Sequence, residues 1–201
     1  MSFGQDWTDH PAHRYAVEVA HGKRIAGKWV VLACKRYLQD LDEQEGRPFE
    51  FDAKVASAWV DFFPTVLRTF KGPKAGQPFE LMEWQKFVVW NIFGWVNRET
   101  SNRRFRYAFV LISRKNGKTV FAAALALAMA VFDDEPSPDC YFLATKKDQA
   151  GEAYRSVYEF AKRSLTIRKH ANIKLRGGRT KSGGAIGYLG SNKDTLDGLD
   201  T

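Results

Sequence analysis

A short basic segment separates two long apolar runs in the middle of the chain. The first run, Phe105–Ile112, is aromatic and β-branched, and its last four residues are wholly apolar, whereas the second, Thr119–Phe132, is rich in alanine. A β-branched apolar run favours a buried strand, and a helix that is apolar on nearly every side is covered on most faces. The pattern therefore predicts a buried strand, a polar loop and a buried helix, in this order.

The polar loop ends in Gly117-Lys118-Thr119, which is the end of the phosphate-binding pattern G-x-x-x-x-G-K-[ST]. A loop that enters a helix N-terminus directs unpaired backbone N–H groups at one point, where the helix dipole favours an anion. Gly117 would let the backbone approach phosphates, Lys118 would neutralise them, and the Thr119 hydroxyl is suited to Mg²⁺. Ile112 stands where the pattern has its first glycine, so the loop departs from it there. The alternative is an ordinary basic loop.

The positive charge lies in the second half of the chain. The formal net charge is +8, yet the first hundred residues carry equal numbers of basic and acidic side chains. Residues 141–181 hold eleven Lys and Arg against three Asp and Glu. A solvated basic face is one interpretation, and a surface for polyanions such as DNA or nucleotide phosphate is the other.

The composition indicates a globular protein, because 44% of the 201 residues are apolar. Cys34 and Cys140 lie far apart in apolar runs, which fits neither a disulfide framework nor a zinc site and favours a reducing compartment. The first ten residues lack the apolar run of a secretory signal, and the run at Thr119–Phe132 is too short to span a bilayer. We therefore expect a soluble, cytosolic protein with no membrane partner.

The first part of the chain is expected to be helical. A short amphipathic stretch begins at Tyr15, and helical periodicity then predicts helices over Gly27–Asp42 and Asp52–Phe70, the second kinked or broken by Pro64. Lys71–Gly76 reads as a linker. We place a boundary there, between a helical subdomain at residues 1–76 and a second domain at residues 77–201.

The second part alternates strands and helices. Besides the elements around the loop, we expect a helix over Glu83–Val96, a buried strand over Cys140–Ala144, a helix opened by a capping box at Thr145 and Asp148 and running to about Leu165, and short strands with Gly-rich turns from Ala171. This order is typical of a parallel α/β sheet. The predicted fold class is α/β, with an incomplete parallel sheet of the P-loop NTPase type preceded by the helical subdomain.

The run Phe109–Thr119 resembles the variant Walker A motif of tailed-bacteriophage large terminase subunits, the ATPases that thread double-stranded DNA into a procapsid. Other segments are similar to further parts of that family, in the same order: Gly27–Val31 and Cys34–Leu38 to its N-terminal pattern, Phe79–Gln85 to its adenine-recognising Q motif, Tyr141–Ala150 to its next strand-to-helix segment, and Ser191–Leu199 to the stretch ahead of its Walker B strand. The resemblance covers nearly the full chain.

This resemblance implies an ATP- and Mg²⁺-dependent motor for viral genome packaging, a hydrolase in which residues 77–201 form the first part of the P-loop ATPase domain. It implies nucleotide contacts from the loop residues Ser113, Arg114, Lys115, Asn116, Gly117, Lys118 and Thr119, and from the amide of Gln85 to adenine. Lys118 and Arg114 would be catalytic, Arg114 as a γ-phosphate sensor or an aid to packing the loop, and Thr119 would hold Mg²⁺. The alternatives are a solvated arginine at 114 and a surface glutamine at 85.

The partners implied are double-stranded DNA, the small terminase subunit, the portal protein and further copies in a homo-oligomeric ring. The location implied is the bacterial host cytoplasm, docked on the procapsid during packaging. Lys146 and Lys147 follow the strand at Cys140–Ala144, at the edge where α/β sheets bind ligands, and are candidate DNA contacts, with helix capping as the alternative. Further candidates are Lys162, Arg163, Arg168 and Lys169, with a solvated face as the alternative.

The family pattern continues with a hydrophobic strand that ends in Asp-Glu, then a coupling motif and a nuclease domain. No such strand occurs before Thr201. We therefore expect an N-terminal portion that binds nucleotide and by itself hydrolyses it very poorly. Two other functions stay open, a helicase-like nucleic-acid-dependent P-loop ATPase and a non-hydrolysing nucleotide- or DNA-binding assembly module.

Overall fold

The computed structural model describes residues 7–133 and 135–190. The chain divides into two compact units, the first formed by residues 1–61 and 80–110 and the second by residues 62–79 and 111–201. The linker predicted at Lys71–Gly76 is a turn within the second unit, where the N–H of Gly76 donates to the carbonyl of Thr69. The units are thus discontinuous in sequence, an arrangement that one linker does not indicate.

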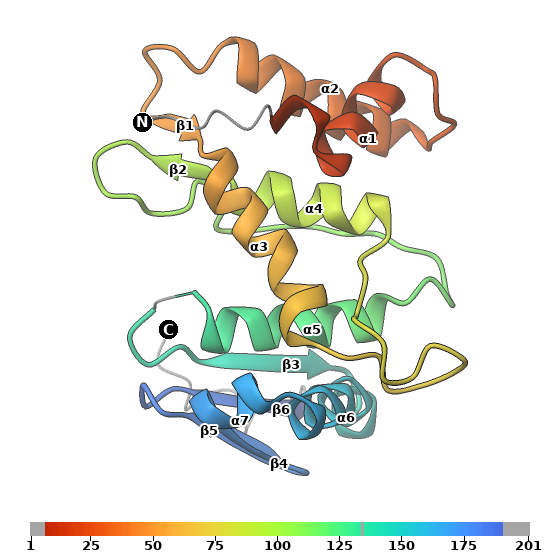
Figure 1. Ribbon diagram of the computed structural model, residues 1–201, viewed down its shortest axis with the longest axis vertical. Coiled ribbons are helices and arrows are strands. Elements are labelled where there is room, and N and C mark those ends of the chain that lie inside the picture. Colours follow the sequence, from red (N-terminus) through yellow and green to blue (C-terminus); the bar gives the residue numbers. More distant parts are fainter. Residues whose placement is uncertain (1–6, 134, 191–201) are drawn as a thin grey trace. The chain divides into compact units, whose positions relative to one another are not determined.

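The first unit is mainly helical (Figure 1). Its elements are a 3₁₀ turn at Trp7–Asp9, α1 (Pro11–Ala20), α2 (Lys28–Asp42), β1 (Phe49–Phe51), the larger part of α3 (Ala53–Val66), α4 (Glu83–Phe93) and β2 (Trp95–Asn97). Helix α1 packs against both α2 and α4. The helix predicted over Gly27–Asp42 is confirmed, with Gly27 as its N-cap.

Helix α3 is shorter than the helix predicted over Asp52–Phe70. The Asp52 carboxylate accepts from the N–H groups of Lys54 and Val55 at 2.8 and 3.0 Å, which satisfies two unpaired donors at the start of the helix. The helix ends at Val66, two residues after Pro64, and the Arg68 guanidinium then donates to the Pro64 carbonyl. Pro64 therefore lies inside the last turn, and the helix ends soon after it.

The helix predicted over Glu83–Val96 is wrong at its end. Helix α4 stops at Phe93, and β2 then pairs antiparallel with β1, with Phe51 opposite Trp95. Gly94 forms the junction because a Cβ there would lie 2.3 Å from the Phe51 ring. A close approach of the backbone to an aromatic ring, which periodicity does not report, thus ends the helix.

Aromatic side chains form the core of the first unit. Trp90 and Tyr37 are fully buried, and the Trp90 indole donates to the Tyr37 hydroxyl at 2.8 Å. Trp59 stacks on Phe93 with ring centroids 3.8 Å apart. Buried indole and phenol groups are stable here because their polar atoms find partners while their rings bury large apolar areas.

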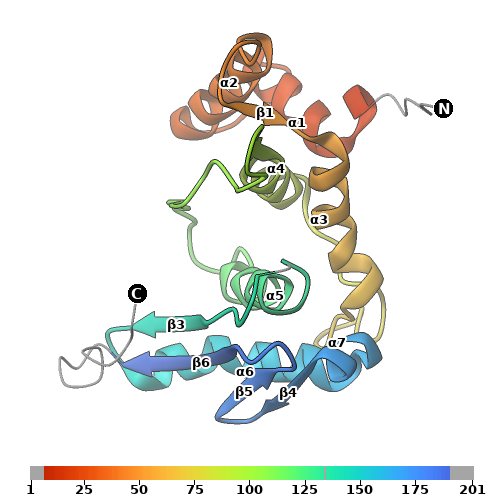
Figure 2. The ribbon, with the colours of Figure 1, turned by 90° about the vertical axis from the view of Figure 1, so that its left-hand side faces the viewer.

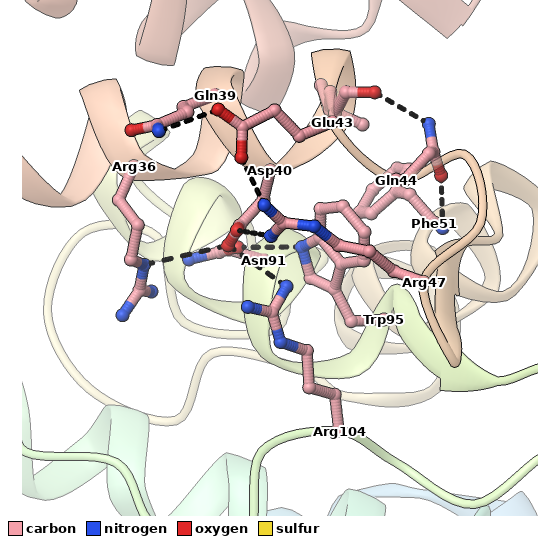
Figure 3. A network of polar contacts seen from close by, with 11 residues as sticks. Arg36, Gln39, Asp40, Glu43, Gln44, Arg47, Phe51, Asn91, Trp95 and Arg104 are labelled. Carbon is pink, nitrogen blue, oxygen red and sulfur yellow. Dashed lines mark hydrogen bonds and ion pairs between the residues drawn. The ribbon is translucent and has the colours of Figure 1, made fainter.

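The carboxylate of Asp40 on α2 lies among three arginines (Figure 3). Its side chain is 9% exposed, and its oxygens lie 3.0 Å from Arg104, 3.4 Å from Arg47 and 4.0 Å from Arg36. The Arg104 guanidinium also lies over the Trp95 ring, 5.0 Å from its centroid. The network therefore ties α2 to the loop between α2 and β1, through Arg47, and to the segment that follows β2, through Arg104.

Replacing this carboxylate should destabilise the first unit. Asp40→Asn removes the negative charge and leaves three arginines facing a neutral amide, so we expect a loss of about 2 kcal/mol in unfolding free energy. The exposed Asp42, on the same helix, provides the control Asp42→Asn, which should change stability by less than about 0.5 kcal/mol. Urea unfolding followed by tryptophan fluorescence reports on this unit, because all six tryptophans lie in it. Equal losses in the two variants would contradict the role of Asp40.

The second unit holds a four-stranded mixed sheet. Its elements after the loop are α5 (Lys118–Val131), β3 (Cys140–Ala144), α6 (Lys147–Arg163), α7 (Leu165–His170), β4 (Ala171–Lys174), β5 (Gly177–Thr180) and β6 (Ala185–Gly190). The strand order is β3-β6-β5-β4, and β3 and β6 run in the same direction (Figure 2). Helix α6 packs on both of these strands and against α5.

The sheet confirms part of the predicted α/β fold and corrects the rest. The strand at Cys140–Ala144, the helix after the loop and the short strands of the tail are confirmed. The expectation of a parallel sheet holds for β3 and β6 but is wrong for the rest of the described sheet, because β4–β5 and β5–β6 pair antiparallel. Short turns such as the one at Leu175-Arg176 connect neighbouring antiparallel strands, whereas parallel strands need a long crossover.

The buried strand predicted over Phe105–Ile112 is also wrong. This segment pairs with no strand among the described residues, and Tyr107, Phe109 and Leu111 are 94%, 91% and 84% exposed. A strand needs a partner for its backbone groups, and apolar composition alone supplies none. The predicted capping box is wrong as well, since the N-cap of α6 is Lys146 rather than Thr145.

Cys34 is buried in the first unit, and the side chain of Cys140 on β3 is partly exposed. Burial raises the pKa of the Cys34 thiol to about 12, so this side chain stays protonated and behaves as a core residue. Among residues 7–133 and 135–190, no helix combines the length and hydrophobicity that a membrane crossing requires.

Candidate functional site

The loop Ser113–Gly117 turns sharply into α5. Gly117 has φ +72° and ψ +10°, a left-handed conformation, and Lys118 is the first residue of the right-handed helix. Successive residues of opposite hand direct their N–H groups toward one concave point, and the first turn of a helix adds donors without intrahelical partners. Lys115 also has a positive φ of 67°. The backbone therefore offers a group of N–H donors to an anion.

The Asn116 side chain closes this loop on itself. Its amide donates to the Ser113 hydroxyl at 2.6 Å and to the Arg114 carbonyl at 3.4 Å. The seven residues from Ser113 to Thr119 are all exposed, and three of them are basic: Arg114, Lys115 and Lys118. The loop thus presents positive side chains and backbone donors to solvent together, which attracts polyanions.

The Thr119 hydroxyl fits the part of a single magnesium ligand. It is exposed on the first turn of α5, directly after Lys118. The described residues contain no cluster of three His, Cys, Asp or Glu side chains that could hold a metal by themselves. Mg²⁺ is usually held by one or two protein oxygens together with substrate phosphates and water, so the role of Thr119 stays a prediction.

Gln85 lies in the first unit, whereas the loop lies in the second. Gln85 is 3% exposed, and its side-chain carbonyl accepts from the N–H of Met82 at 2.9 Å, which stabilises the start of α4. The alternative of a surface glutamine is therefore wrong. Its contact with an adenine base stays a prediction.

A family model described as "Terminase large subunit, ATPase domain" matches residues 83–201. The match covers more than half of the chain and includes Gln85, the loop and every strand of the mixed sheet. The chain belongs to this terminase family. Neither the comparison with curated proteins nor the comparison with solved structures found a match.

Membership in the terminase family confirms the resemblance carried by the Walker A-like run. It assigns the chain at family level to nucleotide-binding ATPases of DNA packaging. The match begins at the first residue of α4. It therefore leaves the N-terminal patterns at Gly27–Val31 and Cys34–Leu38 as predictions, and Ser191–Leu199 lies outside the described residues.

The predicted DNA contacts lie at different places in the terminase fold. Lys146 and Lys147 begin α6, where Lys146 makes no capping hydrogen bond with its side chain. The four others occupy the last turns of two helices and are all exposed: Lys162 and Arg163 on α6, Arg168 and Lys169 on α7. Arg163 forms an ion pair with Glu159.

A groove of about 520 Å³ brings two of these residues together with two others that the sequence did not single out individually. Lys162 and Arg168 line it with Arg179 and Lys181, while Arg163 and Lys169 do not. The charge excess at residues 141–181 indicated the region. The alternation of Arg179 and Lys181, two residues apart, is the signal in the sequence that could have placed both on one side of a strand.

A side chain at position 117 should strain the loop. Gly117→Ala places a Cβ in the left-handed region, which costs roughly 1–2 kcal/mol. Gly27→Ala is a matched control, because Gly27 also precedes a helix but has an ordinary φ of −65° and nothing within 4 Å of its would-be Cβ. We expect urea unfolding followed by far-UV circular dichroism to show the larger loss for Gly117→Ala. Equal losses would contradict the left-handed conformation.

Proposed function

We propose that this chain is the ATP-binding portion of a viral DNA-packaging motor. In this motor, hydrolysis of ATP is coupled to the translocation of double-stranded DNA into a procapsid. The loop Ser113–Thr119 holds the triphosphate of ATP. The observation that carries the proposal is the left-handed Gly117 immediately before the right-handed Lys118, at the exposed N-terminus of a long helix. This backbone arrangement binds anions without any contribution from side chains.

Each loop residue has a part in this proposal. Gly117 brings the backbone close to the phosphates, and its N–H and those of Lys118 and Thr119 donate to phosphate oxygens. The Lys118 ammonium neutralises the β- and γ-phosphates as negative charge develops on the leaving group. Arg114 lies four residues before Lys118 on the same exposed loop and serves as the γ-phosphate sensor. Ser113 and Asn116 hold the loop closed through their mutual hydrogen bond.

Mg²⁺, when bound, would supply positive charge that offsets the negative charge of the phosphates. Thr119 would hold it through the side-chain oxygen. The wider proposal includes the partners expected above, namely DNA, the small terminase subunit, the portal protein and a ring of identical copies, with docking on the procapsid in the host cytoplasm. Gln85 is proposed to read the adenine edge.

Removal of the loop lysine should weaken nucleotide binding. Lys118→Ala deletes one charge-assisted contact worth about 1.5–3 kcal/mol, so we expect the affinity for MgATP to fall by roughly 10- to 100-fold. Lys174→Ala is the control, because Lys174 is an exposed lysine of the same unit on β4. Isothermal titration calorimetry with MgATP measures both. An unchanged affinity in Lys118→Ala would refute the assignment of the loop.

The magnesium contact can be separated from the phosphate contacts. Thr119→Ala removes the hydroxyl, so we expect the stimulation of ATP binding by Mg²⁺ to be lost while binding of ATP in excess EDTA is unchanged. Thr119→Ser keeps the hydroxyl and should retain the stimulation. The comparison of affinities with and without Mg²⁺ decides the point, and stimulation that persists in the alanine variant would show that Thr119 is not the ligand.

A further inference from the structure

The groove in the second unit is formed by three elements. The last turns of α6 and the end of α7 contribute Tyr158, Lys162 and Arg168, and the β4–β5 hairpin and the residue after it contribute Arg179, Thr180 and Lys181. None of the described residues that line the groove is acidic. Four positive charges around about 520 Å³ form a concave surface that favours an anion.

Hydrogen bonds fix the walls of this groove. The Tyr154 hydroxyl on α6 donates to the Lys174 carbonyl at 2.8 Å, and burial raises the pKa of Tyr154, so the donor stays protonated. The N–H of Lys181 donates to the His170 carbonyl at 2.8 Å, which ties the end of the hairpin to α7. The basic side chains therefore extend from backbone that is held in place.

The four basic residues have no ion-pair partner within the described part of the chain, whereas two other arginines of α6 do. Arg163 is paired with Glu159, and Arg155 lies 3.6 Å from Glu152. Basic residues in the last turns of helices stabilise the helix dipole, which accounts for Lys162 and Arg168. It does not account for Arg179 on β5 or for Lys181 after it. Stabilisation of helix dipoles thus explains two of the four basic residues and leaves Arg179 and Lys181 unexplained.

We propose that this groove is a second phosphate-binding site, distinct from the Ser113–Thr119 loop, which holds the sugar–phosphate backbone of DNA. The inference rests on the proposed function, because that function supplies DNA as the polyanion. Flexible lysine and arginine side chains, rather than converging backbone donors, suit a phosphodiester backbone, whose repeated charges carry no sequence information. Tyr158 and Thr180 add hydroxyl groups, which also contact phosphate oxygens in protein–DNA complexes.

The test compares two double variants that remove the same charges. The groove variant, Lys162→Gln with Arg179→Gln, removes one lysine and one arginine from the groove. The control variant, Lys174→Gln with Arg176→Gln, also removes one lysine and one arginine, but from exposed positions of the same hairpin that lie outside the groove. Fluorescence anisotropy of a labelled 20-base-pair duplex is measured across a salt series. Each phosphate contact contributes about 0.9 to the slope of log K against log salt, so the groove variant should lose about two units of slope, and the control should keep it. The affinity at 0.1 M salt should fall on the order of tenfold or more.

Three further measurements keep the outcome decisive. The charge-preserving pair Lys162→Arg with Arg179→Lys should retain the wild-type slope, and MgATP affinity should be unchanged in the groove variant. Equal slopes in groove and control variants, or wild-type protein without affinity for the duplex, would overturn the inference. An equal loss of duplex and inorganic tripolyphosphate binding would also overturn it, in favour of a site for free phosphate. The Lys118→Ala calorimetry tests the loop separately, so the failure of one site does not imply the failure of the other.

Discussion

The second unit depends on the change of backbone conformation from left-handed at Gly117 to right-handed at Lys118. The helix that follows buries Phe121, Leu127 and several alanines, so its position is set by apolar packing along its length. Its N-terminus must begin abruptly, because the residues before it are polar and exposed. A left-handed glycine permits this beginning without a capping side chain, and the first N–H groups of a helix have no partner within the helix itself. The same constraint that starts the helix thus creates the anion site.

Local patterns predicted those elements whose stability is mainly local. Helical periodicity identified α2 to within one residue, and an apolar pentapeptide identified β3 with its observed bounds. The strand expected over Phe105–Ile112 was wrong because burial of a strand depends on partners elsewhere in the chain. Composition reports that the segment is suited to a sheet, not that a neighbouring strand is available, and none pairs with it in residues 7–133 and 135–190.

The two candidate sites differ in how much of each could be predicted. The loop is contiguous in sequence, so its residue types and their spacing were enough to predict a phosphate-binding loop. The sequence did not reveal the hydrogen bond between Asn116 and Ser113. The groove joins α6, α7 and β5, and only the hairpin brings Arg179 near Lys162. A charge count locates such a region, but it cannot separate the lysines and arginines that line a groove from those that are paired, such as Arg163.

The chemistry of the two sites suits two kinds of phosphate. Converging backbone donors have fixed directions, so the loop suits one compact triphosphate, and its affinity depends on geometry that a single methyl group at residue 117 disturbs. Lysine and arginine side chains in the groove keep their freedom and bind largely by releasing counterions. Binding at the groove should therefore weaken steeply with salt while binding at the loop weakens less. In the proposed motor this difference is useful, because the DNA backbone would be released and bound again while the nucleotide stays bound.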